Sequence, residues 1–213
     1  GLQEDEATIR DDVQGLAHIG LNIAAGEREC VWKDEINDLI LPVPKKLAKS
    51  SQSETKEKLR EKLRNLPHEY LSLVDLAYDS KQNRLFEMKV IELLTEECGF
   101  QGLHLGGSRR PDGVLYTAGL TDNYGIILDT KAYSSGYSLP IAQADEMERY
   151  VRENQTRDEL VNPNQWWENF ENGLGTFYFL FVAGHFNGNV QAQLERISRN
   201  TGVLGAAASI SQL

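Results

Sequence analysis

The chain has 213 residues, enough for one domain of ordinary size and a smaller appendage. A hydrophobic fraction of 40%, with eight Tyr, seven Phe and three Trp, supports a real core and excludes a disordered chain. The net charge of −10 argues against wholesale nucleic-acid binding, and no apolar run is long enough to span a membrane. An acidic start without a signal-peptide pattern, and only two cysteines, predict a cytoplasmic protein in a reducing compartment.

The first 46 residues predict a unit of their own. Apolar residues at near-helical spacing predict a helix over 7–19, and a hairpin is expected over 21–32. Because a winged-helix module ends in this way, the unit is either the tail of a DNA-recognition region or a plain structural connector. Pro42 and Pro44 then predict an extended linker.

Beyond the linker, helical patterns alternate with strand patterns. Helices are predicted over 54–65, 68–78, 83–98, 139–154 and 190–200, with another that begins at 162–163. Strands are predicted from 112 onward and over 124–129, 177–183 and 203–208. This alternation predicts an α/β fold with a mixed central β-sheet flanked by helices, in a domain over 47–213.

The stretch 106–131 carries the residues best suited to chemistry. Asp112 follows a basic glycine-rich loop, and an apolar strand ends in Asp129, Thr130 and Lys131. Residues two apart in a strand share a face, so Asp129 and Lys131 point the same way, while Thr130 offers its carbonyl nearby. If the strand that begins at Asp112 pairs with this one, the two carboxylates converge on an oxygen-lined site that suits Mg²⁺.

Such a site fits hydrolysis of a phosphodiester. The metal would activate water, and Lys131 would help lower the pKa of that water and neutralise charge in the transition state. Each residue alone has a plainer explanation, because Pro-Asp-Gly is ordinary turn chemistry and a lysine can end a strand in solvent. The conjunction of Pro-Asp, an apolar strand and Asp-x-Lys is what indicates a nuclease.

Neighbouring side chains are candidates for supporting roles. Ser108, Arg109 and Arg110 lie directly before the site and are expected to grip DNA backbone phosphates. Glu87, on the preceding helix, is a possible extra acid, a solvated helix residue, or a hydrogen-bonding partner that supports the site from outside. Because the chain is acidic, its own grip on DNA should be weak and targeting should come from elsewhere.

Nine short stretches go beyond a general motif: 68–70 (HEY), 87–90 (EMKV), 104–109 (HLGGSR), 111–113 (PDG), 129–134 (DTKAYS), 143–147 (QADEM), 153–157 (ENQTR), 166–167 (WW) and 184–186 (GHF). Together they resemble the cleavage domain of FokI-type type IIS restriction endonucleases. The likeness runs from about residue 47 to near the end of the chain.

The resemblance implies a restriction-endonuclease-like PD-(D/E)xK core. Asp112, Asp129 and Lys131 match the family's catalytic residues, with Asp112, Asp129 and the Thr130 carbonyl at Mg²⁺, for which Mn²⁺ can substitute. The implied activity is that of a type II site-specific deoxyribonuclease from a bacterial cytoplasm. It cleaves double-stranded DNA at an offset from a site read by a separate N-terminal recognition domain, of which residues 1–46 would be the tail or connector.

The resemblance also implies a transient homodimer of cleavage domains, formed through the helix over 139–154. Asp145 and Arg149 fall on the family's interface pair, and Arg152 stands where the prototype has an acidic residue. The family's domain continues past the position matching Leu213, so a C-terminal truncation is expected. Two alternatives stay open: a single-strand nickase of the same superfamily, and a catalytically inactive, DNA-associated dimerisation module.

Overall fold

The computed structural model describes residues 23–25, 30–32, 51–62, 66–117 and 123–213. The chain divides into two compact units, Gly1–Lys49 and Ser50–Leu213. In the first unit, β1 (Ile23–Ala25) and β2 (Cys30–Trp32) pair antiparallel, which confirms the predicted hairpin. The helix predicted over 7–19 and the proline linker lie outside the described residues.

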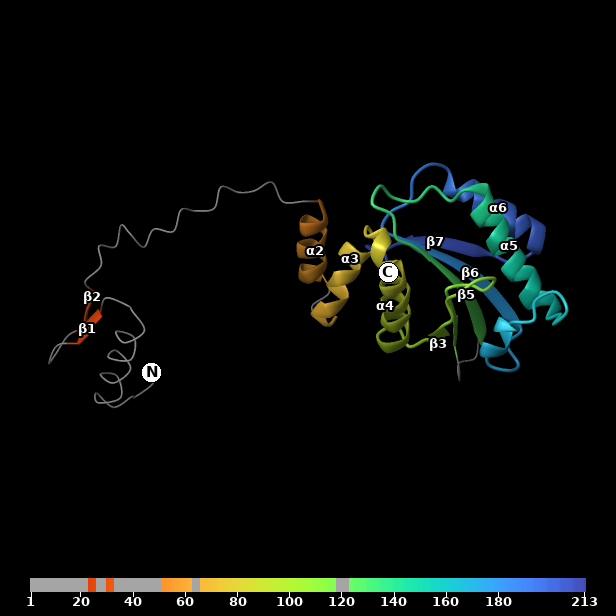
Figure 1. The fold of residues 1–213 in the computed structure, drawn as a ribbon, viewed down its shortest axis with the longest axis horizontal. Helices are drawn as coiled ribbons and strands as arrows, with labels where there is room; N and C mark the ends of the chain where they lie inside the picture. The colour runs from red at the N-terminus through yellow and green to blue at the C-terminus, as the bar shows by residue number, and fades with distance from the viewer. Residues whose placement is uncertain (1–22, 26–29, 33–50, 63–65, 118–122) are drawn as a thin grey trace. The chain divides into compact units, whose positions relative to one another are not determined.

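A five-stranded mixed sheet forms the centre of the second unit (Figure 1). Its strands follow one another in space in chain order: β3 (Gln101–His104), β4 (Gly113–Tyr116), β5 (Tyr124–Lys131), β6 (Thr176–Ala183) and β7 (Gly205–Ser209). The pairings β3–β4 and β4–β5 are antiparallel, whereas β5–β6 and β6–β7 are parallel. The sheet is therefore mixed, as the sequence predicts.

Helices cover both faces of this sheet, with α4 on one side and α5 and α6 on the other (Figure 1). The helices are α2 (Ser51–Lys62), α3 (Leu73–Leu76), α4 (Asn83–Glu96), α5 (Ile141–Thr156) and α6 (Val190–Thr201). Successive strand residues face opposite sides, so Leu128 packs in the cluster with Phe86 of α4, while Ile127 packs in the cluster with Met147 of α5. Burial on both faces explains why the central strands are almost continuously apolar.

Three local predictions were wrong. The helix predicted over 68–78 is a 3₁₀ turn (His68–Ser72) followed by the short α3, and the helix predicted from 162 is only a 3₁₀ turn (Trp166–Asn169). The third is an omission, because no strand was predicted over the residues of β3. Within the described part of the chain, no helix is both long and apolar enough to cross a membrane.

Candidate active site

The register of β4 and β5 brings Asp112 to Asp129. Gly113 lies opposite Leu128 in the antiparallel ladder, so the next step outward places Asp112 beside Asp129. The backbone N–H and the hydroxyl of Thr130 both donate to Asp112 Oδ2, at 2.7 and 3.1 Å. Because both bonds go to Oδ2, the Oδ1 atom of Asp112 can turn towards a cation.

Asp129 and Lys131 form a buried ion pair, with Lys131 Nζ 2.8 Å from Asp129 Oδ2. Burial raises the pKa of the Asp129 carboxyl to about 7; Lys131 opposes that rise and Asp112 adds to it. For Lys131, burial alone lowers the pKa, but Asp129 and Asp112 outweigh it and the net pKa is raised. Negative charge thus exceeds positive charge in this part of the protein, which is the electrostatic condition for cation binding.

The oxygen atoms at this place fit a divalent cation. The N–H and C=O of one strand residue point to the same side, so the Thr130 carbonyl faces the side where Asp112 lies, beyond the first residue of β4. Two carboxylates and a carbonyl are hard ligands, and Mg²⁺ binds through one or two carboxylates while it keeps several waters. Among the residues that the structure describes, no group of three or more His, Cys, Asp and Glu is arranged to hold a metal.

Glu87 of α4 lies close to this pair rather than in solvent. Its Oε2 is 2.8 Å from Nε2 of His104, the last residue of β3, and its side chain is only 14% exposed. Burial raises the pKa of Glu87; the contact with His104 opposes that rise, and the charge of Asp112 adds to it. Glu87 is half-buried and paired with His104, so it is not a fully solvated helix residue, and its role as an extra acid stays a prediction.

The basic loop that precedes Asp112 is exposed at Ser108 and Arg109 and half-buried at Arg110. Arg109 has a φ of 61°, in the left-handed region. Its guanidinium donates to the carbonyl of Val161 at 3.0 Å, in the connection between α5 and β6. The loop is therefore held against a segment that is distant in sequence.

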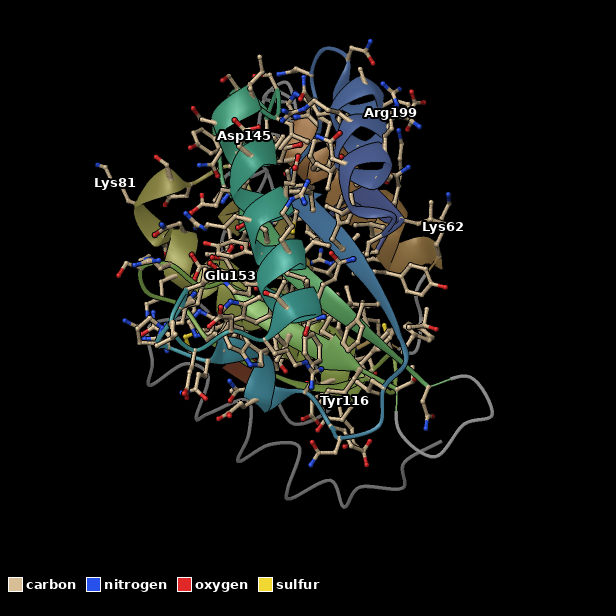
Figure 2. All side chains as sticks on the ribbon, turned by 90° about the vertical axis from the view of Figure 1, so that its right-hand side faces the viewer. Lys62, Lys81, Tyr116, Asp145, Glu153 and Arg199 are labelled. Atoms are coloured by element: carbon tan, nitrogen blue, oxygen red, sulfur yellow. The ribbon has the colours of Figure 1, made fainter. Side chains whose placement is uncertain are left out.

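The three predicted dimer residues lie around one hollow of about 560 Å³ on the α5 face, lined by Asp145, Glu148, Arg149, Arg152, Glu153, Thr156, Val161, Arg196 and Asn200. Figure 2 shows Asp145 on α5, beside α6. Within the single chain each has a partner: Asp145 pairs with Arg196 at 2.7 Å, Arg149 with Glu146 at 3.1 Å, and Arg152 with Glu148 at 2.8 Å. An exchange of partners across a dimer would have to replace these contacts.

Glu146 is a nearby acid that the sequence predictions missed. Its carboxylate accepts from the Tyr150 hydroxyl at 3.0 Å and from Gln143 at 3.1 Å, and its charge adds to the rise in the pKa of Asp129. Gln143, Glu146 and Tyr150 lie at helical spacing on one face of α5, the signal that could have pointed to them.

A mixed sheet between two helical layers, with Pro-Asp directly before one strand and Asp-x-Lys at the end of its antiparallel neighbour, defines the core of a PD-(D/E)xK nuclease. Comparison with known families matches residues 49–213 to the family described as "FokI, cleavage domain". The chain belongs to the FokI cleavage-domain family.

The relatives of this chain are type II restriction enzymes. It is 48% identical to FokI of Planomicrobium okeanokoites over 100% of this chain and 37% of that protein, and 38% identical to StsI of Streptococcus sanguinis over 96% and 34%. Among solved structures, restriction endonuclease FokI bound to DNA matches with a TM-score of 0.76 at 47% identity, over 99% of this chain and 38% of that one. A second structure of FokI matches with a TM-score of 0.75. The chain thus spans little more than a third of the length of these relatives.

Proposed function

We propose that the second unit is a Mg²⁺-dependent endonuclease domain that hydrolyses phosphodiester bonds in both strands of DNA without reading their sequence. The observation that carries this proposal is the register that sets Asp112 beside Asp129, with Lys131 2.8 Å from Asp129. Mn²⁺, which also prefers carboxylate and carbonyl oxygens, should substitute for Mg²⁺.

Each residue then has a defined task. Asp112, Asp129 and the Thr130 carbonyl hold the cation, which when bound supplies Lewis-acid chemistry towards the phosphate. The ammonium of Lys131, held in place by Asp129, faces the charge that develops on the phosphate in the transition state. Because this donor is already oriented, it needs no reorganisation as the bond breaks.

The proposed DNA contacts are local. Ser108, Arg109 and Arg110 would hold backbone phosphates, which positions a duplex but carries no sequence information. With a net charge of −10, the chain has little general attraction for DNA, so delivery by an N-terminal recognition domain of a longer bacterial cytoplasmic protein is part of the proposal. Residues 1–46 are proposed as the tail of that recognition part, or its connector.

Cleavage of both strands in a single binding event calls for two active sites, which a dimer provides. We place the dimer contact on the exposed face of α5 that carries Asp145, Arg149 and Arg152. Both charge signs are present there, so the same patch can face itself across a two-fold axis. The rate of double-strand cleavage should then rise more steeply than linearly with protein concentration.

Supercoiled plasmid incubated with the protein and Mg²⁺ tests the proposal. Linear product that disappears in EDTA supports it. Open circles alone would assign the chain to single-strand nickases, and no product would assign it to inactive dimerisation modules. The Asp112→Ala variant serves as the control for contaminating nucleases, because it should yield no product at all.

A further inference from the structure

Glu153 is a carboxylate buried within the second unit, on the part of α5 away from Asp145 (Figure 2). Its side chain is 2% exposed, and its Oε2 accepts from Asn162 Nδ2 at 2.9 Å and from Trp166 Nε1 at 2.8 Å. Arg149 faces the other oxygen, with Nε 3.6 Å from Oε1. Burying a carboxylate costs free energy unless hydrogen-bond donors and a cation surround it. Core packing alone therefore does not account for this group of side chains.

Asn162 connects this carboxylate to the basic loop. The side chain is fully buried, and its Nδ2 donates both to Glu153 Oε2 and, at 2.8 Å, to the carbonyl of Arg109. Its Oδ1 accepts from the N–H of Asn164 at 3.0 Å, so both amide hydrogens and the oxygen are in use. A flipped amide would set oxygen against a carbonyl and a carboxylate, which leaves one possible orientation.

The basic loop, to which Asn162 donates, has a backbone conformation that needs support from its surroundings. Arg109 adopts a left-handed φ of 61°, which a residue with a side chain keeps only when its surroundings impose it. The bond from Asn162 fixes its carbonyl, and the bond from its own guanidinium to Val161 fixes its side chain. Two residues further on the chain reaches Pro111 and then Asp112, so the tethered loop leads directly into the proposed active site.

We propose that Glu153 and Asn162 are positioning residues that hold the basic loop over the active site, so that Arg109 and Arg110 meet the DNA backbone in a fixed place. What the loop binds rests on the proposed function; the tether itself does not. Neither residue touches the reacting atoms. Contacts to DNA phosphates stabilise the bound substrate and the transition state equally. Their loss should therefore raise KM rather than lower kcat.

The test compares the full chain with its Asn162→Ala, Glu153→Gln and Asn164→Ala variants in steady-state cleavage of a short duplex with Mg²⁺. Asn162→Ala cuts the tether and should raise KM about tenfold, with kcat within about twofold. Glu153→Gln keeps the size of the side chain and one acceptor oxygen. It should therefore disturb the fold less than Asn162→Ala does and raise KM by a smaller factor. Asn164→Ala, an exposed neighbour in the same segment, is the matched control and should leave KM unchanged.

A role in folding alone would reduce the fraction of active enzyme, so that kcat falls while KM stays constant; that pattern overturns the proposal. Amide hydrogen exchange, measured without DNA or metal, supplies a readout that does not depend on catalysis. Exchange in 106–111 should accelerate in Asn162→Ala and not in Asn164→Ala. Unchanged exchange in this loop, acceleration spread over the whole domain, or faster loop exchange with an unchanged KM would each contradict the positioning role. If the wild-type chain does not cleave DNA, the proposed function fails, and local acceleration in 106–111 still supports the tether.

Discussion

Replacing Lys131 with Ala should nearly stop cleavage while the fold remains intact. The Lys131 ammonium lies 2.8 Å from Asp129 Oδ2, and its side chain is 17% exposed, so it is a held donor in a place largely closed to water. A donor of this kind, aimed at charge that develops in the transition state, contributes roughly 2.7–4 kcal/mol, so kcat should fall about 10²–10³-fold. Its loss also removes the cation that opposes the raised pKa of Asp129, so that pKa should rise further and weaken Mg²⁺ binding at neutral pH.

Single-turnover cleavage of a labelled duplex at one sub-saturating Mg²⁺ concentration, measured near pH 7 and again above pH 8, separates these two effects. The part of the loss that comes from protonated Asp129 should recover at the higher pH, whereas the lost transition-state contact should not. Lys62→Ala, an exposed lysine at the end of α2, is the matched control and should cleave normally. If Lys131→Ala retains a rate within about threefold of the wild type, the role assigned to this ammonium is refuted.

Three further outcomes can be measured on the folded protein. Mg²⁺ at about 100 times its Kd should stabilise the wild type by about 2.7 kcal/mol in thermal unfolding, and Asp112→Ala should abolish that gain; an equal gain in both would place the metal elsewhere. In EDTA, the wild-type Tm should fall as the pH is raised from about 5 to 8. The pKa of Asp129 is near 3.8 in the unfolded protein and about 7 in the folded protein, so the folded protein loses the stabilisation that protonated Asp129 provides across that window. Asp129→Asn should remove this part of the pH dependence, and an unaltered profile in the variant would contradict the assignment. Trp166→Phe leaves the buried Glu153 short of one donor and should cost about 1–3 kcal/mol in urea unfolding, a loss that would not be seen if the indole contact were incidental.

The two carboxylates and the lysine could be predicted because their arrangement is local. Asp129 and Lys131 lie two apart in one strand and so share a face, and Asp112 begins the strand that precedes it. Only the pairing of these two strands had to be assumed, and the observed register, with Gly113 opposite Leu128, confirms that pairing. β3 was not predicted because it is short and contains Gly102, and glycine is disfavoured in strands. The structure shows why glycine stands there: a Cβ would lie 2.1 Å from the carbonyl oxygen of Val114.

The surroundings of the site could not be predicted in the same way, because they depend on contacts between distant segments. Asn162 and Arg109 are 53 residues apart, and no periodicity links them. The resemblance assigned Asp145 and Arg149 to a dimer interface, but it could not show that Asp145 pairs with Arg196 of another helix. Local patterns thus predicted the residues proposed for chemistry, whereas the residues that position them emerged only from the packed fold.

The central claim, that Asp129 and Asp112 hold the metal with which this domain cleaves DNA, is tested most directly by plasmid cleavage with the wild type and the near-isosteric Asp129→Asn variant side by side. Circular dichroism should show the same fold for both proteins. In Mg²⁺ the wild type should convert supercoiled plasmid to linear DNA, and the variant should leave it supercoiled. Linear product from Asp129→Asn at the wild-type rate would contradict the account.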